Sequence, residues 1–239
     1  MTDEQIDLSG KLALITGASR GIGRAVAKAY AKAGAHVILV ARTTGALEEL
    51  DDEIRAEGGQ ATLIPLDLRD FDKVDMLGPA IAEKFGKLDI FVGNAGLLGT
   101  LGPLGHADAK EFERVMQVNV TANFRLIRTL DPLLRAADNG RAIFVSTSQG
   151  AVAGRAYWGV YSISKAALES MMRTYADETT KTNIKVNAVN PGAVRTKMRA
   201  EAMPGEDPET IPAPEDIVDT FLQLAANDCV YHGQVINAQ

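Results

Sequence analysis

The sequence has almost no cysteine and little histidine. Cys229 is the single cysteine in 239 residues, and the three histidines, His36, His106 and His232, are widely spaced. One cysteine cannot form a disulfide within the chain, and zinc or iron–sulfur sites built from four thiolates are excluded within one chain. Because the histidines also form no ligand pattern, the sequence predicts no metal site.

Basic residues are outnumbered, and long apolar runs are missing. The chain has 25 Lys and Arg against 31 Asp and Glu, a net charge of −6, which argues against binding to a nucleic-acid backbone. No stretch approaches the roughly 20 apolar residues of a membrane span. The first ten residues, MTDEQIDLSG, have neither the basic nor the apolar region of a secretory signal. We therefore expect no nucleic-acid partner, no membrane span and a cytoplasmic location, which a lone thiol fits.

The remaining composition is that of an ordinary globular protein. The chain is 46% hydrophobic and 23% charged. A chain of this length buries about 70–75% of its unfolded surface when it folds, so it needs no disulfide or metal. No linker or low-complexity tract interrupts it, and we expect a single domain over residues 1–239.

Short apolar runs alternate with longer amphipathic segments. Strands are expected at residues 12–15, 37–40, 61–65, 88–92, 142–145, 184–189 and 234–237. Helices are expected at residues 23–33, 46–56, 71–85, 112–135, 161–180 and 214–226. The strands are continuously apolar, which is typical of parallel strands covered on both faces. The alternation predicts an α/β fold with a doubly wound, mainly parallel seven-stranded sheet and helices on both faces.

Two features depart from this regular pattern. Pro132 lies inside the helical stretch 112–135 and allows a bend or a break there. Residues 197–214 are the one long irregular segment, rich in Met and Pro. Long loops in compact domains tend to be functional, so we expect this loop on the substrate side.

The first strand-to-helix turn is rich in glycine. Residues 16–23 read TGASRGIG, so that Gly17, Gly21 and Gly23 have the spacing GxxxGxG. Glycines let the backbone approach a pyrophosphate, and the helix N-terminus supplies amides and a partial positive charge. A tight turn without a ligand is the alternative, but the position between a strand and a helix favours phosphate binding.

The end of the second strand indicates which dinucleotide would bind. An acidic residue about 20 positions past the glycines would bind the ribose 2′-hydroxyl of NAD. Ala41 and Arg42 stand there instead, and Arg20 in the glycine-rich turn is a second cation on the same side. Arginine pairs bidentately with phosphate. Either arginine alone reads equally well as a solvated surface residue; the pair favours NADP(H).

A tyrosine and a lysine lie one helical turn apart. Tyr161 and Lys165 are four residues apart near the start of an expected helix, so both lie on one face. A tyrosine with a pKa of about 10 is a poor acid–base group near neutrality, and an ammonium one turn away would lower that pKa. Taken alone, the same spacing is that of an ordinary surface pair.

Polar residues follow or interrupt other apolar elements. Ser146 and Ser148 come at the end of the fifth strand, and either hydroxyl could bond a substrate oxygen. Ser148 precedes Tyr161 by 13 residues. Asn94 begins the NAG that closes the fourth strand. Asn119 lies in an apolar helical stretch, where an asparagine is usually a packing or kink residue.

In combination, these motifs resemble the short-chain dehydrogenase/reductase family, in its single-domain, NADP-preferring type. The resemblance runs from about Gly10 to Val235, and its elements follow the family's order: TGASRGIG, Asp67-Leu68, NAG, VNV, a serine, YSISK and NPG. It implies a Rossmann-like fold and an oxidoreductase that transfers a hydride between NADP(H) and a carbonyl or secondary alcohol. The LLG after NAG and the Trp158-Gly159 before the tyrosine are similar to a bacterial branch of oxidoreductases.

The resemblance also implies a role for each matching residue. Tyr161 would be the acid–base, and Lys165 would hold the nicotinamide ribose and lower the tyrosine pKa. Ser148 would polarise the carbonyl, and Asn119 would bend its helix and position a water in a proton relay. The residues implied to bind the cofactor are Gly17, Ser19, Arg20, Gly21, Ile22, Gly23, Arg42, Asp67, Leu68, Asn94, Ala95, Gly96, Tyr161, Lys165, Pro191, Gly192, Val194 and Thr196.

The expected pocket walls favour an apolar substrate. They are Leu97, Leu98, Tyr157, Trp158 and Met198. One alternative function is a 3-oxoacyl-thioester reductase of fatty-acid synthesis, which needs a basic patch for an acidic carrier. The candidates for that patch are Arg155, Arg195, Lys197 and Arg199. Another alternative is a catalytically silent dinucleotide-binding regulator, which the intact set of Ser148, Tyr161 and Lys165 disfavours.

The two longest helical stretches predict assembly. Residues 112–135 and 161–180 carry more apolar side chains than one core-facing stripe needs. Members of the family pair through these helices. We therefore expect a homodimer or homotetramer.

Overall fold

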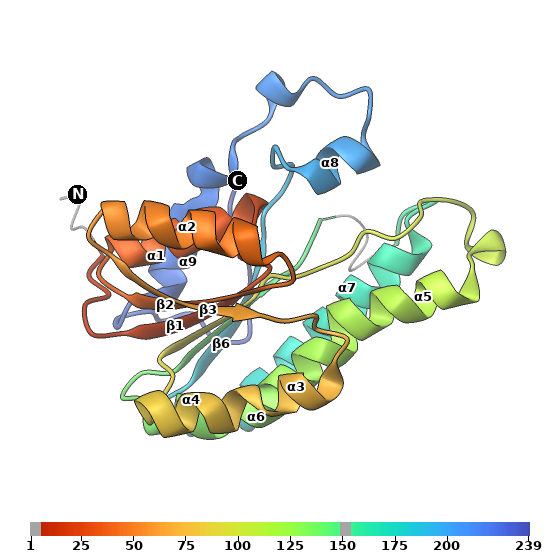
Figure 1. Cartoon of the computed structure of the whole chain (residues 1–239). Helices are drawn as coiled ribbons and strands as arrows, with labels where there is room; N and C mark the ends of the chain where they lie inside the picture. Colours follow the sequence, from red (N-terminus) through yellow and green to blue (C-terminus); the bar gives the residue numbers. More distant parts are fainter. Residues whose placement is uncertain (1–5, 149–153) are drawn as a thin grey trace.

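The computed structural model describes residues 6–148 and 154–239, and a seven-stranded sheet lies at its centre (Figure 1). The strands are ordered β3-β2-β1-β4-β5-β6-β7, and every neighbouring pair is parallel. The strands are β1 (Leu12–Thr16), β2 (His36–Ala41), β3 (Gln60–Pro65), β4 (Ile90–Gly93), β5 (Arg141–Val145), β6 (Lys185–Asn190) and β7 (Val235–Asn237). The predicted doubly wound sheet is confirmed, and it is wholly parallel.

Helices cover both faces of the sheet, with α1, α2 and α9 on one side and α3, α4, α6 and α7 on the other (Figure 1). In β1, Ala13 and Ile15 pack toward the first group, and Leu12 and Leu14 pack toward the second. This double burial explains why the strands are continuously apolar. The helices are α1 (Gly21–Lys32), α2 (Thr44–Ala56), α3 (Phe71–Asp75), α4 (Leu77–Phe85), α5 (Ala109–Met116), α6 (Ala122–Ala136), α7 (Gly159–Glu178), α8 (Lys197–Ala202) and α9 (Val218–Ala225).

The helix expected over residues 71–85 is divided into α3 and α4, with the division at Met76. Gly78, just after the division, donates its backbone N–H to Thr129 Oγ1 on α6 at 3.1 Å. A Cβ at Gly78 would overlap the Thr129 carbonyl oxygen. The backbones of α4 and α6 therefore approach each other closely at this point. The spacing of apolar residues within 71–85 does not reveal this tertiary contact.

The stretch expected over residues 112–135 is longer and has a different irregularity. It begins with α5, passes through a π-helical turn, η2 (Gln117–Thr121), and continues as α6. Pro132 lies inside α6 without ending it. The bond that proline removes would have gone to the carbonyl of Arg128, a residue on the exposed side of the helix.

The segment 197–214 is less irregular than expected. Thr196 caps α8 by accepting the Arg199 N–H at its Oγ1, 3.2 Å away. Two short 3-10 turns follow, η3 (Pro208–Thr210) and η4 (Pro214–Ile217), and a further one, η1 (Leu104–His106), precedes α5. Across the described residues, no helix combines the length and hydropathy that crossing a bilayer requires.

Candidate active site

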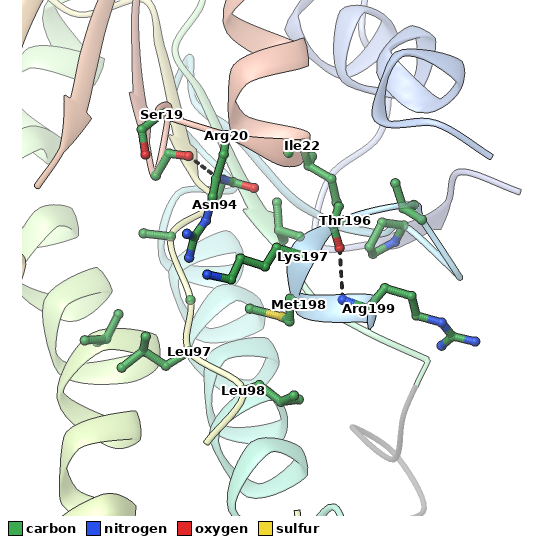
Figure 2. A pocket seen from close by; sticks show the side chains of 18 of the residues that line it. Ser19, Arg20, Ile22, Asn94, Leu97, Leu98, Thr196, Lys197, Met198 and Arg199 are labelled. Atoms are coloured by element: carbon green, nitrogen blue, oxygen red, sulfur yellow. Dashed lines mark hydrogen bonds between the residues drawn. The ribbon is translucent and has the colours of Figure 1, made fainter. Parts of the chain in front are cut away.

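A cavity of about 460 Å³ lies at the carboxyl edge of the sheet, where the strand order reverses between β1 and β4 (Figure 2). Ligands of open α/β sheets bind at this kind of position. The predicted site residues that line it are Gly17, Ser19, Arg20, Gly21, Ile22, Arg42, Asp67, Leu68, Asn94, Ala95, Gly96, Tyr161, Lys165, Pro191, Gly192, Val194 and Thr196. Gly23, Asn119 and Ser148 are described residues that are not part of this lining.

The glycine-rich turn after β1 packs tightly against the end of β4. Gly17 has a φ of +67°, and a Cβ there would lie 2.9 Å from Asn94 Nδ2. A Cβ at Gly23 would lie 2.5 Å from the Gly17 carbonyl oxygen. Gly23 therefore does not face the cavity but allows α1 to begin close beneath the turn.

Asn94 holds the turn through Thr16, which the sequence motifs did not single out. Asn94 Nδ2 donates to the Thr16 carbonyl at 2.8 Å. Thr16 Oγ1 in turn accepts the backbone N–H groups of Asn94 and Ala95, both at 3.1 Å. In the sequence, the signal for this connection between β1 and β4 is a threonine at the end of an otherwise apolar strand. The structure shows that Thr16 is buried.

The N-terminus of α1 is open toward the cavity. Its N-cap residue, Arg20, makes no side-chain capping bond, and the first turn contains no acidic residue. Gly21 and Ile22 of that turn line the cavity. The free amides and the helix dipole therefore favour an anion at this point.

Two arginines border the same end of the cavity. Arg20 and Arg42 are exposed and line it, and neither forms an ion pair with any residue in the described ranges. The nearby Asp67 is held by Arg69, with an Arg69 Nη2 to Oδ2 distance of 2.6 Å, and this pairing is the main reason that the pKa of Asp67 is lowered to about 2. The charge of Arg42 also contributes to this lowering, more weakly than Arg69 does, so Asp67 is paired mainly with Arg69.

Tyr161 and Lys165 line the cavity from α7, beside the end of β5, and are 8% and 3% exposed; β1 and β4 separate β5 from β2, which Arg42 follows. Lys165 Nζ lies 5.8 Å from the centre of the Tyr161 ring and donates to the Val145 carbonyl at 2.6 Å. Burial raises the pKa of Tyr161 to about 12, opposed by a hydrogen bond with the Thr147 side chain. Burial lowers the pKa of Lys165 to about 8, opposed by the charge of Glu169.

The direction for Tyr161 is set by burial: the cost of burying a phenolate raises its pKa, and Lys165 is not among the causes of that shift. The lowering that the family resemblance implies for Lys165 stays a prediction. Lys165 is itself buried and weakly held as an ammonium. The tyrosine is therefore a protonated acid at neutral pH.

The hydroxyl groups after β5 have three different environments. Ser146 is 1% exposed and lines the cavity, but its hydroxyl donates to the Glu169 carboxylate. Thr147 also lines the cavity and bonds Tyr161. Ser148 is exposed and precedes residues 149–153, which lie outside the described residues. The structure thus commits Ser146 elsewhere and brings Thr147, a residue that sequence reasoning passed over, to the phenol.

Asn119 is fully buried in the π-helical turn η2 and joins three elements. Its Oδ1 accepts the Leu97 N–H at 2.7 Å, and its Nδ2 donates to the Leu97 carbonyl and to Ser164 Oγ, both at 2.9 Å. It therefore ties the loop after β4 to α7, close to Tyr161 and Lys165.

An apolar cluster separate from both cores forms the substrate side of the cavity. Leu98, Trp158 and Tyr161 are its buried members, and Leu101, Met198, Ala202 and Met203 pack against them. Leu97, Leu98 and Met198 lie across the cavity from Ser19 in Figure 2. Tyr157 is 64% exposed and is not among the lining residues, so its expected place in the wall is wrong.

The basic patch considered for an acidic carrier is largely paired. Arg199 forms a two-pronged ion pair with Glu206, and Arg195 pairs with Glu209 at 2.6 Å. The Arg155 guanidinium lies over the Trp158 ring at 5.3 Å. Lys197 forms no ion pair with a carboxylate of the described residues.

Comparison with known proteins defines the class. Residues 11–207 match the family model of the short chain dehydrogenases. The uncharacterized oxidoreductase YciK of Escherichia coli K12 is 42% identical over 224 residues, 92% of this chain and 88% of that protein. The chain belongs to the short-chain dehydrogenase family and is an oxidoreductase.

Two solved structures share the whole fold. A short chain dehydrogenase from Shigella flexneri 2a strain 301, complexed with NADP, is 40% identical with a TM-score of 0.94, covering 99% of this chain and 100% of that one. A second, from Escherichia coli CFT073 and complexed with NADPH, is also 40% identical with a TM-score of 0.94, covering 99% of each chain.

Proposed function

We propose that this protein is an NADP(H)-dependent carbonyl reductase or alcohol dehydrogenase, acting through one dinucleotide-binding and catalytic domain over residues 1–239. The observation that carries the proposal is the polarity of the cavity. The side next to β1 and β2 has Arg20, Arg42 and the open N-terminus of α1, and the side next to β5 has Tyr161 and Lys165. The two relatives whose structures hold NADP and NADPH support this choice of cofactor.

The residues present fit this cofactor. Ser19, Gly21 and Ile22 at the start of α1 would hold the pyrophosphate, and Arg20 and Arg42 the 2′-phosphate. Asp67 and Leu68 would border the adenine, residues 94–96 the adenosine ribose, and Lys165 the nicotinamide ribose. The nicotinamide carboxamide would lie against Pro191, Gly192, Val194 and Thr196. When bound, the cofactor supplies or accepts the hydride.

The chain's own residues supply the proton and the polarisation. Tyr161, protonated at neutral pH, would donate its phenolic proton to the carbonyl oxygen during reduction. We assign carbonyl polarisation to Ser148, from its position in the family motif, and bonding of the phenol to Thr147. Asn119 fixes the loop and helix around this centre.

The substrate fitted to this cavity is mainly apolar, and residues 197–214 form part of its side of the site. The cluster of Leu98, Trp158 and Met198 faces it. A 3-oxoacyl group on an acidic carrier is disfavoured, because Arg195 and Arg199 are already paired. A silent regulator is disfavoured too, since it needs no buried tyrosine beside a buried lysine.

The setting of the enzyme is also part of the proposal. We place it in the cytoplasm, which the unpaired Cys229 fits, and expect a homodimer or homotetramer formed through α6 and α7. Fractionation of the source cells with an antibody against the chain tests the location.

The decisive experiment is NADPH oxidation across ketones, aldehydes, quinones and 3-oxoacyl thioesters, comparing the unmodified protein with Tyr161→Phe. Phenylalanine keeps the ring volume but lacks the proton donor. Loss of general acid catalysis lowers turnover roughly a hundredfold to ten-thousandfold, while NADPH affinity stays close to unchanged. A variant that keeps most of its rate would show that Tyr161 is not the acid; Ser148→Ala beside Thr147→Val separates the two hydroxyls.

A further inference from the structure

Glu169 is a buried carboxylate to which neither the sequence motifs nor the proposed reaction gives a role. It lies on α7 one turn after Lys165 and is 3% exposed. One carboxylate oxygen accepts the Ser146 hydroxyl, and the other accepts Arg173 Nη2 at 2.9 Å. Burying a carboxylate is costly unless it is paired and hydrogen-bonded, so this position calls for a physical reason.

The bonds of Glu169 and Lys165 form a two-point contact between β5 and α7. Lys165 donates to the carbonyl of Val145, and Glu169 accepts from the hydroxyl of the next residue, Ser146. Successive residues at the carboxyl end of β5 are thus held by side chains on successive turns of α7. Thr147, which contacts the phenol, follows directly, so the contact fixes it relative to Tyr161.

Glu169 also lies four residues after Lys165 on the same face of α7, and both side chains are buried. From α7, Lys165 meets Tyr161, which is neutral up to a pKa of about 12, and Glu169. From β5 it meets the Val145 carbonyl, and the loop after β4 passes nearby at Gly96, where an added Cβ would lie 3.6 Å from Lys165 Nζ. Among the described residues of β6, η2 and α5, none contributes a charge that moves the pKa of Lys165; burial and Glu169 are its two causes. Arg173, half exposed, balances the carboxylate from the solvent side.

We propose that Glu169 is a positioning residue that anchors the end of β5 through Ser146 and supplies the counter-charge that keeps Lys165 an ammonium. The inference rests on the proposed function where it concerns cofactor binding, because only an ammonium donates all its hydrogen bonds to a ribose. Its electrostatic part does not depend on any cofactor.

The first experiment titrates Lys165 directly by ¹³C NMR of lysine-labelled protein without cofactor, with the Lys165 Cε signal identified by its loss in Lys165→Met. The unmodified protein should titrate near a pKa of about 8. Glu169→Gln keeps the acceptor for Ser146 but removes the charge, and an opposite charge at short range is worth about one pKa unit or more. We expect a midpoint lower by about one unit.

Two further variants separate charge from anchoring. Ser146→Ala loses the hydrogen bond but keeps the carboxylate, so the Lys165 midpoint should stay near that of the unmodified protein. Arg173→Gln leaves the carboxylate without its solvent-side cation, so the midpoint should rise. Because Arg173 is half exposed, replacing it should not disturb folding, so Arg173→Gln still tests the proposal if Glu169→Gln fails to fold. An unchanged midpoint in Glu169→Gln, or no rise in Arg173→Gln, overturns the proposal.

The second experiment measures NADPH affinity against pH by fluorescence titration. A one-unit fall in the Lys165 midpoint reduces its protonated fraction at pH 8 roughly fivefold, so Glu169→Gln should bind NADPH about fivefold more weakly there and normally near pH 6. If Lys165→Met binds NADPH as tightly as the unmodified protein, the proposed contact with the ribose is wrong. The NMR titration then still decides the role of Glu169, so the two failures are distinguishable.

Discussion

Tyr161 is buried against its neighbouring lysine, and that burial leads to a pH prediction at the scale of a single residue. Its pKa is raised to about 12. At a pH between these two values the phenol of Tyr161 is therefore still protonated, whereas a free tyrosine, with a pKa of about 10, has ionised. An ultraviolet difference titration of the protein without cofactor, unmodified minus Tyr161→Phe, should therefore show no phenolate below about pH 11. A difference signal with a midpoint under pH 10 would mean that Lys165 outweighs burial after all.

Ala41 and Arg42 carry the second prediction at this scale. Both line the cavity end that Arg20 also borders. The pair Ala41→Asp and Arg42→Ile removes one cation and places a carboxylate where NAD-binding proteins have one. Losing a charge-assisted hydrogen bond costs about 1.5–3 kcal/mol, roughly tenfold to a hundredfold in affinity. Titration with both cofactors should show the preference for NADPH falling by that factor. An unmodified protein that already binds NADH more tightly contradicts the role of Arg42.

Single residues also mark the limit of what could be predicted from the sequence. The four-residue spacing places Tyr161 and Lys165 on one face whatever the fold does, so that pair was predictable. Glu169 was not, because a glutamate four residues after a lysine reads equally well as an exposed helix pair. Its burial depends on the end of β5, which no local pattern places beside it.

At the scale of elements, the same limit appears in the helices. Apart from α8, which lies in the segment expected to be irregular, the existence of the helices followed from apolar periodicity, but their interruptions depend on tertiary contacts. The division at Met76 arises where Gly78 meets Thr129, and the π-helical turn η2 surrounds Asn119, whose side chain bonds Leu97 and Ser164. Such partners lie far away in sequence, so the pattern of residues 71–85 or 112–135 alone looks continuous.

The connection between the loop after β4 and α7 carries an element-scale prediction. Tyr157 has a φ of +69°, the one positive value for a non-glycine residue in the described ranges. Its carbonyl accepts the Gly102 N–H at 2.8 Å, which joins the two segments beside Trp158. A left-handed backbone costs an L-residue roughly 1–2 kcal/mol. The strain is retained where the turn positions a wall of the cavity.

Tyr157→Gly should relieve that strain, and Tyr157→Val should increase it. The tyrosine side chain is 64% exposed, so little buried surface is lost in either variant. We expect glycine to raise the free energy of unfolding by about 0.5 kcal/mol and valine to lower it by about 1 kcal/mol or more. Denaturant unfolding of the two variants side by side measures this; a valine variant as stable as the glycine variant would contradict the assigned strain.

At the scale of the whole molecule, most of the apolar surplus on the two long helices belongs to the protein's own core. Leu126 and Leu130 on α6, and Leu168 and Met172 on α7, are buried within the chain. The surplus that remains on the surface is smaller: Phe124 on α6 is 50% exposed and Ile163 on α7 is 38% exposed. The expectation of an oligomer therefore depends on these two positions rather than on the overall composition of the helices.

Phe124→Asp provides the test of that assembly. If α6 and α7 form the contact between copies, a charge at position 124 must be buried there without a partner, which costs several kcal/mol. We expect light scattering at micromolar concentration to give a multiple of 25.5 kDa for the unmodified protein and a smaller particle for the variant.

Val230→Asp is the matched control, because Val230 is 80% exposed but lies outside both helices. It should leave the α6–α7 contact intact. A 25.5 kDa particle for the unmodified protein would rule out the assembly, and equal particle sizes for Phe124→Asp and the unmodified oligomer would place the contact elsewhere.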